Sequence, residues 1–156
     1  MTSYSTSRIF VVGGTGAQGL PVIKTLVADG KYFVRALTRD RGSRRAQALA
    51  ELGNVEIVEG TFADEDTLRA GFQGCDGAYI NIDGFNTGEK TEMYWAIRAY
   101  EIAIEEGVRF FVYGEIHYHD AFGVPHWTKY RLQLDPDDEG IKEDAFIFCA
   151  KGNESN

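Results

Sequence analysis

Short apolar runs alternate along the first part of the chain with longer segments in which apolar positions recur at helical spacing. The run Ile9–Val12 has no polar position and ends in glycine, as expected of a strand buried on both faces of a sheet. Strands are predicted at 9–12, 32–37, 55–58, 77–82 and 108–112, and helices at 20–29, 43–52, 65–72 and 91–106. This alternation predicts an α/β fold, a doubly wound parallel sheet with right-handed crossovers in three α/β/α layers.

Residues with known preferences for helix ends fall where these predicted helices begin and end. Ser43 and Asp64 directly precede predicted helices, and short polar side chains at that position accept hydrogen bonds from free N–H groups of the first turn. Gly30 and Gly53 follow predicted helices, where the left-handed conformation of glycine terminates a helix.

The alternation of apolar runs with segments of helical spacing becomes irregular after Gly114, and residues 115–156 form a divergent acidic tail. In this tail we predict a short helix over 125–134, which Pro136 ends, and a possible sixth strand at 145–149. The sheet should therefore have five or six strands. No repeat or linker divides the chain, so 1–156 is predicted to be a single domain with 1–114 as its well-patterned core.

The amino-acid composition limits the cell compartments and the classes of binding partner that are expected for this protein. A net charge of −8 argues against binding to nucleic acid or to an anionic membrane. Cys75 and Cys149 have no metal-ligand spacing and are interpreted as small buried residues of a reducing compartment. No apolar run is long enough for a membrane span, and the first residues do not resemble a signal peptide, so we expect a cytoplasmic protein.

A glycine-rich segment between the first predicted strand and the first predicted helix is the most informative part of the sequence. Glycines at 13, 16 and 19 allow a tight turn and let the backbone approach a pyrophosphate, which the free N–H groups of the following helix then bind. This context predicts a Rossmann-type dinucleotide-binding domain. The candidate cofactor-binding residues here are Gly13, Thr15, Gly16, Ala17, Gln18 and Gly19.

The end of the second predicted strand bears on the choice of cofactor. An NAD site usually has an acidic residue here for the ribose, whereas an NADP site presents arginine to the 2′-phosphate. Four arginines lie within 39–45, and Arg39 and Arg44 are the candidates for that phosphate. Asp40 argues against NADP, because an acidic residue here is typical of an NAD site. It either pairs with Arg44 or binds the ribose of the cofactor. We favour NADP(H).

Several segments resemble the NmrA-like group of atypical short-chain dehydrogenases. They are the glycine segment, Leu37-Thr38-Arg39, the stretch from Val58-Glu59-Gly60 to Thr67-Leu68, and Glu105-Glu106-Gly107-Val108-Arg109-Phe110-Phe111-Val112-Tyr113-Gly114. The resemblance covers residues 7–114. It implies NADP(H) binding, with the three glycines at the pyrophosphate, Arg39 at the 2′-phosphate and Asn81 near the adenosine or nicotinamide side of the groove.

The chain also departs from the pattern of that group. Members often carry Gly-Asp after the third strand, where this chain has Gly60-Thr61, and a small polar residue after the fifth, where Glu115 follows Gly114. Relatives typically continue into a C-terminal substrate-binding region, so this chain is expected to be shortened at its C-terminus.

Candidate catalytic residues lie in the tail. The Tyr-x-x-x-Lys pair of short-chain dehydrogenases does not occur. Lys129 resembles the lysine that NmrA-like proteins place in the corresponding helix. His117 and His119 share one face with Glu115 if the fifth strand continues, and an acid–base role for His117 or a metal site stays open beside a polar loop without function. We assign no metal. An acidic calcium loop at 135–139 is rejected because Pro136 and Phe146 stand at the wrong positions.

Three functions remain compatible with the sequence. The first is an NADP(H)-binding sensor or regulator, and the second is an NADPH-dependent reductase of a small carbonyl or enone substrate. The third is a non-redox isomerase or cyclase that uses His117, His119 and His126. Partners are then the dinucleotide and a small-molecule substrate or a protein, and a shortened Rossmann domain with an exposed apolar edge is a candidate homodimer.

Overall fold

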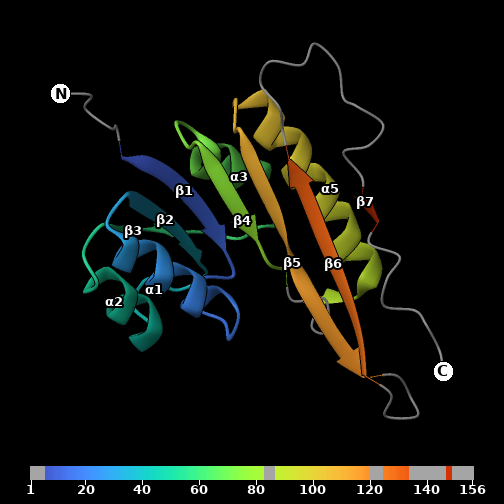
Figure 1. The fold of residues 1–156 in the computed structure, drawn as a ribbon, viewed down its shortest axis with the longest axis horizontal. Coiled ribbons are helices and arrows are strands. Elements are labelled where there is room, and N and C mark those ends of the chain that lie inside the picture. Colours follow the sequence, from blue (N-terminus) through green and yellow to red (C-terminus); the bar gives the residue numbers. More distant parts are fainter. Residues whose placement is uncertain (1–5, 83–86, 120–124, 134–146, 149–156) are drawn as a thin grey trace.

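The computed structural model describes residues 6–82, 87–119, 125–133 and 147–148, with side chains through Tyr113 except that of Glu89. These residues form one mixed sheet with helices on both faces (Figure 1). Its strands are β1 (Ser7–Val12), β2 (Tyr32–Thr38), β3 (Val55–Glu59), β4 (Gly77–Ile80), β5 (Phe110–His119), β6 (Pro125–Gln133) and β7 (Ile147–Phe148). The helices are α1 (Gly19–Asp29), α2 (Arg44–Ala50), α3 (Glu65–Phe72) and α5 (Glu89–Glu105).

The strand order confirms the predicted fold class. The sheet runs β3-β2-β1-β4-β5-β6-β7, and its first five members are parallel. The chain moves outward from β1 in one direction through β2 and β3, then returns to β4 on the other side. This is the doubly wound order of a Rossmann-type sheet, with a topological switch point between β1 and β4.

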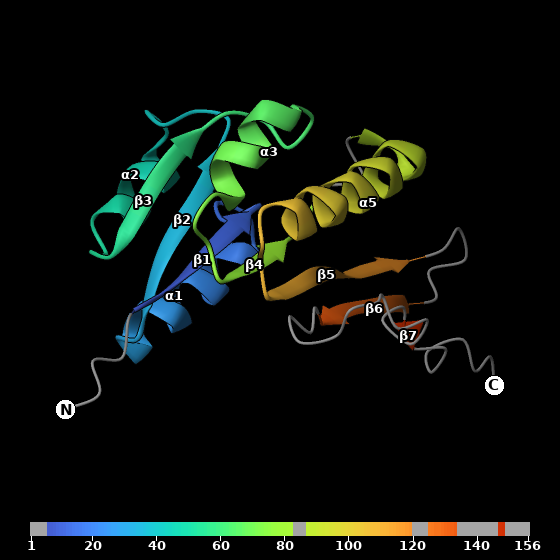
Figure 2. The ribbon, with the colours of Figure 1, turned by 90° about the horizontal axis from the view of Figure 1, so that it is seen from above.

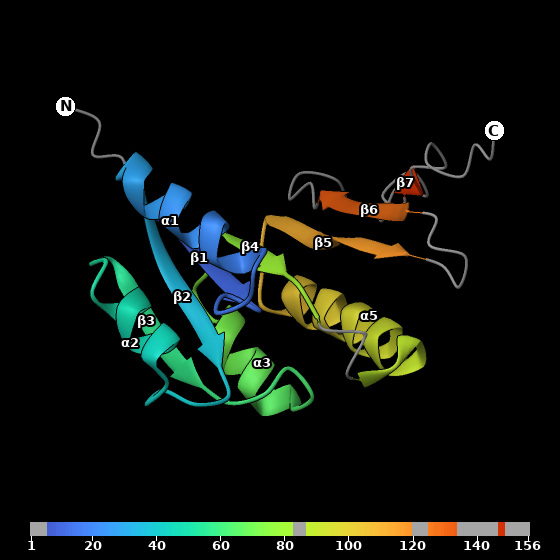
Figure 3. The same cartoon turned by 90° about the horizontal axis from the view of Figure 1, so that it is seen from below.

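Two apolar layers hold the helices to the sheet. In β1, Phe10 and Val12 point toward α3 and α5, whereas Val11 points toward Ile23 of α1, because successive side chains of a strand face opposite sides. The same alternation explains why the strand sequence is apolar throughout. Figures 2 and 3 show α1 on one side of the sheet and α3 and α5 on the other, as the three-layer prediction requires.

The helix ends follow the sequence signals. The Ser43 hydroxyl accepts a hydrogen bond from the N–H of Ala46 at 3.2 Å, and Asp64 accepts one from the N–H of Thr67 at 2.9 Å. A further bond from the Thr67 hydroxyl is the main reason that the pKa of Asp64 lies below its usual range. Gly30 ends α1 with a φ of 73°.

The tail corrects one prediction. Residues 125–133 form a strand, β6, not a helix, and β6 pairs antiparallel with an extended β5. Trp127, Thr128 and Tyr130 are residue types that favour strands, and the open edge of β5 supplies the partner that a local pattern does not reveal. Within the predicted strand at 145–149, the described residues 147–148 form β7, so the sheet has seven strands in the described part of the chain, not five or six.

Cys75 is buried, as predicted, whereas Cys149 lies outside the described residues. The Cys75 thiol donates to the carbonyl of Gly71 at 3.3 Å. Burial is the largest cause that raises the pKa of this thiol to about 11. No helix in the described part of the chain is both long and apolar enough to cross a membrane.

The raised pKa predicts that Cys75 reacts slowly in the folded protein. In a Cys149→Ser background at pH 8, the thiolate fraction of Cys75 is expected to be roughly 100-fold lower than that of a free cysteine. Modification by a disulfide reagent should therefore be slow in buffer and fast in urea, which absorbance of the released thiol measures. Equal rates in the two solvents would show that Cys75 is accessible in the fold.

Candidate functional site

The residues that the sequence singled out for a cofactor meet at one edge of the sheet, which we call the carboxyl edge because β1, β2 and β4 end there. The glycine turn 13–18 follows β1, the arginine-rich segment 39–45 follows β2, and Asn81 follows β4. The turn stands at the switch point between β1 and β4, where open α/β sheets bind ligands.

Close packing explains why the turn needs glycine at two of its three predicted positions. Gly13 has a φ of 78°, and a Cβ atom there would overlap the carbonyl oxygen of Asn81. A Cβ atom on Gly19 would overlap the Gly13 carbonyl oxygen and lie 2.7 Å from the Cα atom of Gly14. These contacts press the start of α1 against the end of β1 and β4.

Gly16 is required for a different reason. Its φ is not positive, and a Cβ atom there would meet only the Gly13 carbonyl oxygen, at 3.2 Å. The protein itself therefore leaves the space above Gly16 open. The absence of a side chain at this position gives another molecule access to the backbone, as the pyrophosphate prediction requires.

The residues after Gly16 carry unused hydrogen-bond donors. Within the described residues, the N–H groups of Ala17, Gln18 and Gly19 donate to no backbone carbonyl. The first backbone bond of α1 runs from Leu20 to the Gly16 carbonyl at 3.1 Å. Free N–H groups at the start of an 11-residue helix, together with its positive dipole end, favour an anion.

Asn81 joins β4 to the glycine turn. Its side-chain Nδ2 donates to the side-chain Oε1 of Gln18 at 3.1 Å, and its backbone N–H donates to the backbone carbonyl of Val12 at 3.2 Å. Gln18 precedes α1 but does not cap it through its side chain. Both side chains thus lie beside the turn, and their contact with a cofactor stays a prediction.

The four arginines after β2 fall into two groups, which differ in whether the guanidinium contacts the rest of the protein. Arg41 donates to the Ile57 carbonyl at 2.7 Å, and Arg45 donates to the Thr15 carbonyl at 3.2 Å, a contact with the glycine turn that the sequence did not reveal. Arg39 and Arg44 are exposed and make no hydrogen bond or ion pair within the described part of the chain. These two guanidinium groups are therefore available to a ligand.

Asp40 does not pair with Arg44, which was one of its two predicted roles. Its Oδ1 atom accepts the N–H of Gly42 at 2.8 Å, so the carboxylate shapes the turn between β2 and α2. Thr38 stabilises the same turn, because its hydroxyl accepts the N–H of Asp40 at 3.3 Å. The turn holds Arg39 at the end of β2.

A buried pair of polar side chains near the carboxyl edge was missed by the sequence analysis. The Tyr113 hydroxyl donates to Glu92 Oε1 at 2.6 Å, and both residues are buried. Tyr113 lies opposite Ile80 in the sheet, next to the end of β4. The pair joins residues of β5 and α5 that are 21 positions apart, so no local pattern marks it.

The predicted catalytic residues of the tail lie on strands. The fifth strand does continue, since His117 belongs to β5 and lies opposite Trp127 of β6. Lys129 belongs to β6 at a break in the pairing, so the helix expected around it is wrong. The side chains of His117, His119, His126 and Lys129 lie outside the described ones, and their catalytic roles stay predictions.

Comparison with known proteins identifies the family. The sequence profile of the NmrA-like family matches residues 5–148. The chain belongs to the NmrA-like family. The NmrA-like family domain-containing oxidoreductase notA' of Aspergillus versicolor is 42% identical over 83 residues, which are 53% of this chain and 23% of that protein. The corresponding oxidoreductase hkm9 of Aspergillus hancockii is 34% identical over 113 residues, 70% of this chain and 33% of that protein.

Solved structures agree with the family assignment. A double mutant of NmrA matches with a TM-score of 0.63 and 26% identity, covering 70% of this chain and 33% of that one. NmrA itself, a negative transcriptional regulator, was solved in complex with NADP and matches with the same TM-score at 24% identity. This NmrA-like chain spans about a quarter to a third of the length of these relatives.

Proposed function

We propose that this NmrA-like chain binds NADP(H), in preference to NAD(H), at the carboxyl edge of its sheet. The observation that carries the proposal is the pairing of two features at that edge. The glycine turn offers free N–H groups beside the open space above Gly16, and Arg39 and Arg44 stand unpaired at the end of the neighbouring strand. Structures of the related NmrA hold NADP or NAD, which supports a dinucleotide at this edge, and the preference for NADP(H) rests on Arg39 and Arg44.

In this proposal the glycine turn and the two arginines bind different parts of the cofactor. The N–H groups of Ala17, Gln18 and Gly19 would bind the pyrophosphate, and Arg39, with Arg44 beyond it, would bind the ribose 2′-phosphate. Asn81 and Gln18 would line the groove next to the turn. When bound, the nicotinamide supplies a hydride donor or acceptor, and the protein supplies its position.

We further propose that the bound dinucleotide serves an oxidoreductase. The curated relatives reported above are named oxidoreductases, which favours this role. The competing role is that of a redox sensor, which the regulator NmrA and the absence of a Tyr-x-x-x-Lys pair favour. Consumption of NADPH with a panel of carbonyl and enone compounds decides between them, because a sensor binds the cofactor without turnover. A cytoplasmic homodimer stays a prediction from the sequence.

Removal of one arginine tests the choice of cofactor. Arg39→Ala is expected to lower NADPH affinity about 10- to 100-fold, the scale of a hydrogen bond to a charged group, and to leave NADH affinity nearly unchanged. Isothermal titration with both nucleotides measures this.

Arg41→Ala is the matched control for that experiment. Arg41 belongs to the same segment but already donates to the Ile57 carbonyl, so its removal should change NADPH affinity less than about threefold, on the scale of an exposed charge. If Arg39→Ala and Arg41→Ala weaken NADPH equally, general charge attracts the nucleotide and Arg39 does not read the 2′-phosphate.

A further inference from the structure

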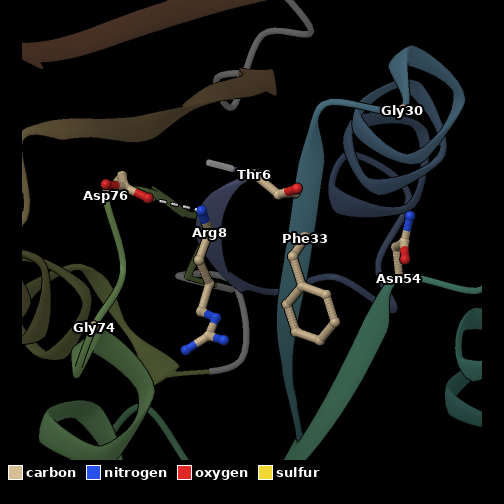
Figure 4. A pocket seen from close by; sticks show the side chains of 7 residues that line it. All are labelled: Thr6, Arg8, Gly30, Phe33, Asn54, Gly74 and Asp76. Carbon is tan, nitrogen blue, oxygen red and sulfur yellow. Dashed lines mark hydrogen bonds between the residues drawn. The ribbon is translucent and has the colours of Figure 1, made fainter. Parts of the chain in front are cut away.

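A polar hollow lies at the opposite edge of the sheet, which we call the amino edge because the parallel strands begin there. It has a volume of about 370 Å³ and is lined by Thr6, Arg8, Phe33, Asn54, Gly74 and Asp76, among others (Figure 4). Arg8 and Phe33 are the second residues of β1 and β2, and Asn54 and Asp76 directly precede β3 and β4. The hollow is therefore separated from the glycine turn by the length of the strands.

Arg8 is the unusual residue of this hollow. Its guanidinium carbon lies 5.2 Å from the centre of the Phe33 ring, and its Nε atom is buried with no hydrogen-bond partner. Asp76 is nearby, but its carboxylate accepts the backbone N–H of Arg8 at 2.8 Å and forms no ion pair with the guanidinium among the described residues. Figure 4 shows the guanidinium pointing away from Asp76.

Other half-buried arginines of the described chain have anionic partners. Arg35 pairs with Glu56 at 3.0 Å, Arg98 pairs with Glu65 at 2.7 Å, and Arg69 pairs with Glu105. A buried N–H donor without an acceptor is unfavourable, because water no longer satisfies it, and Nε of Arg8 is such a donor. Arg8 has no anionic partner among the described residues, and an anion that enters the hollow would supply one.

The surroundings of Arg8 define the kind of anion. A guanidinium presents a planar fork that matches a carboxylate, and Phe33 covers one face of that fork with an apolar ring. Asp76 adds a negative charge to the same hollow, which disfavours a doubly charged phosphate. Gly74 lies beside the fork, since a Cβ atom there would be 3.7 Å from Nη1 of Arg8.

We propose that the hollow at the amino edge binds a small organic monocarboxylate, whose carboxylate pairs with Arg8 and whose apolar part lies against Phe33. The Asn54 amide, on the far rim of the hollow, supplies a further polar contact (Figure 4). This site is independent of the proposed dinucleotide site, because it shares no residue with it.

Benzoate is the probe that tests this site, and benzamide is its neutral counterpart. Titration of the full chain with benzoate, followed by the NMR signal of the Arg8 Nε–H group, should show saturable binding, and benzamide should not shift that signal. Arg8→Gln is expected to weaken benzoate binding at least tenfold. Arg8→Lys keeps the charge but removes the fork, and it should also weaken binding.

The dinucleotide serves as the control for folding and for independence. Arg8→Gln should change NADPH affinity less than twofold, and Arg39→Ala should leave benzoate affinity unchanged even if NADPH does not bind at all. The proposal is overturned if benzoate shows no saturable shift, if benzamide shifts the signal equally, or if Arg8→Gln binds benzoate as well as the original chain. Tighter Arg8-dependent binding of inorganic phosphate than of benzoate would also overturn it.

Discussion

Gly16→Val is expected to abolish detectable NADPH binding, a loss of more than about 100-fold, while the free energy of unfolding changes by less than about 1 kcal/mol. The reason is that the protein does not fill the space above Gly16. A Cβ atom there meets only the Gly13 carbonyl oxygen at 3.2 Å, and the φ of Gly16 is not positive, so a shift of a few tenths of an ångström is expected to accommodate a side chain. The same side chain occupies the space that we assign to the pyrophosphate. Calorimetric titration with NADPH and urea denaturation measure the two effects separately.

Two other substitutions in the same region, Gly19→Ala and Ala28→Val, serve as controls for Gly16→Val. A Cβ atom on Gly19 would overlap backbone atoms of Gly13 and Gly14, so Gly19→Ala should lower stability by about 1–3 kcal/mol or more as well as binding. Ala28 is exposed near the other end of α1, and Ala28→Val should preserve both. If Gly16→Val binds NADPH normally, the pyrophosphate does not lie above the turn.

Phe72→Ala is expected to give the largest loss of stability, about 3–5 kcal/mol, which is the usual cost of a large aromatic side chain deleted from a core. Phe72 of α3 is fully buried, and its ring lies 5.0 Å from that of Phe10 and 6.4 Å from that of Phe111. It therefore joins α3 to β1 and β5 at once. Removal of the ring leaves a cavity between elements that are far apart in the sequence.

Urea denaturation followed by circular dichroism measures the loss at Phe72. Met93→Ala is the control, because Met93 is 56% exposed on α5 and its truncation should change stability by no more than about 0.5 kcal/mol. A loss below 1 kcal/mol for Phe72→Ala would show that this aromatic cluster is not the centre of the core.

The sequence predicted the five parallel strands and four helices because their signals are local. Apolar runs, helical spacing and the capping residues Ser43 and Asp64 each specify an element without knowledge of its neighbours. Residues 125–133 were misjudged because their state depends on a distant partner, the edge of β5. A short segment with mixed polarity has no such local signal.

In the candidate site too, features with a local sequence signal were predicted and contacts between distant residues were not. The three glycines were recognisable as part of a turn, because a turn between a strand and a helix needs particular residue types at fixed positions, whereas the role of Arg39 at the 2′-phosphate stays a prediction. Gly14 was not recognised, although a Cβ atom there would lie 2.6 Å from Cδ1 of the buried Ile23, whose side chain would have to move. The contact of Arg45 with Thr15 joins positions 30 residues apart, which sequence spacing does not connect.

The most direct test of dinucleotide binding is a map of backbone amide shifts on addition of NADPH and, separately, of NADH. NADPH is predicted to shift the amides of residues 13–19 and of 39–45, because the pyrophosphate and the 2′-phosphate bind these two segments. NADH, which lacks the 2′-phosphate, should shift the first segment at higher concentration and leave the second nearly unchanged. Absence of shifts in the glycine turn, or identical shifts of 39–45 with both nucleotides, would contradict the proposed NADP(H) site.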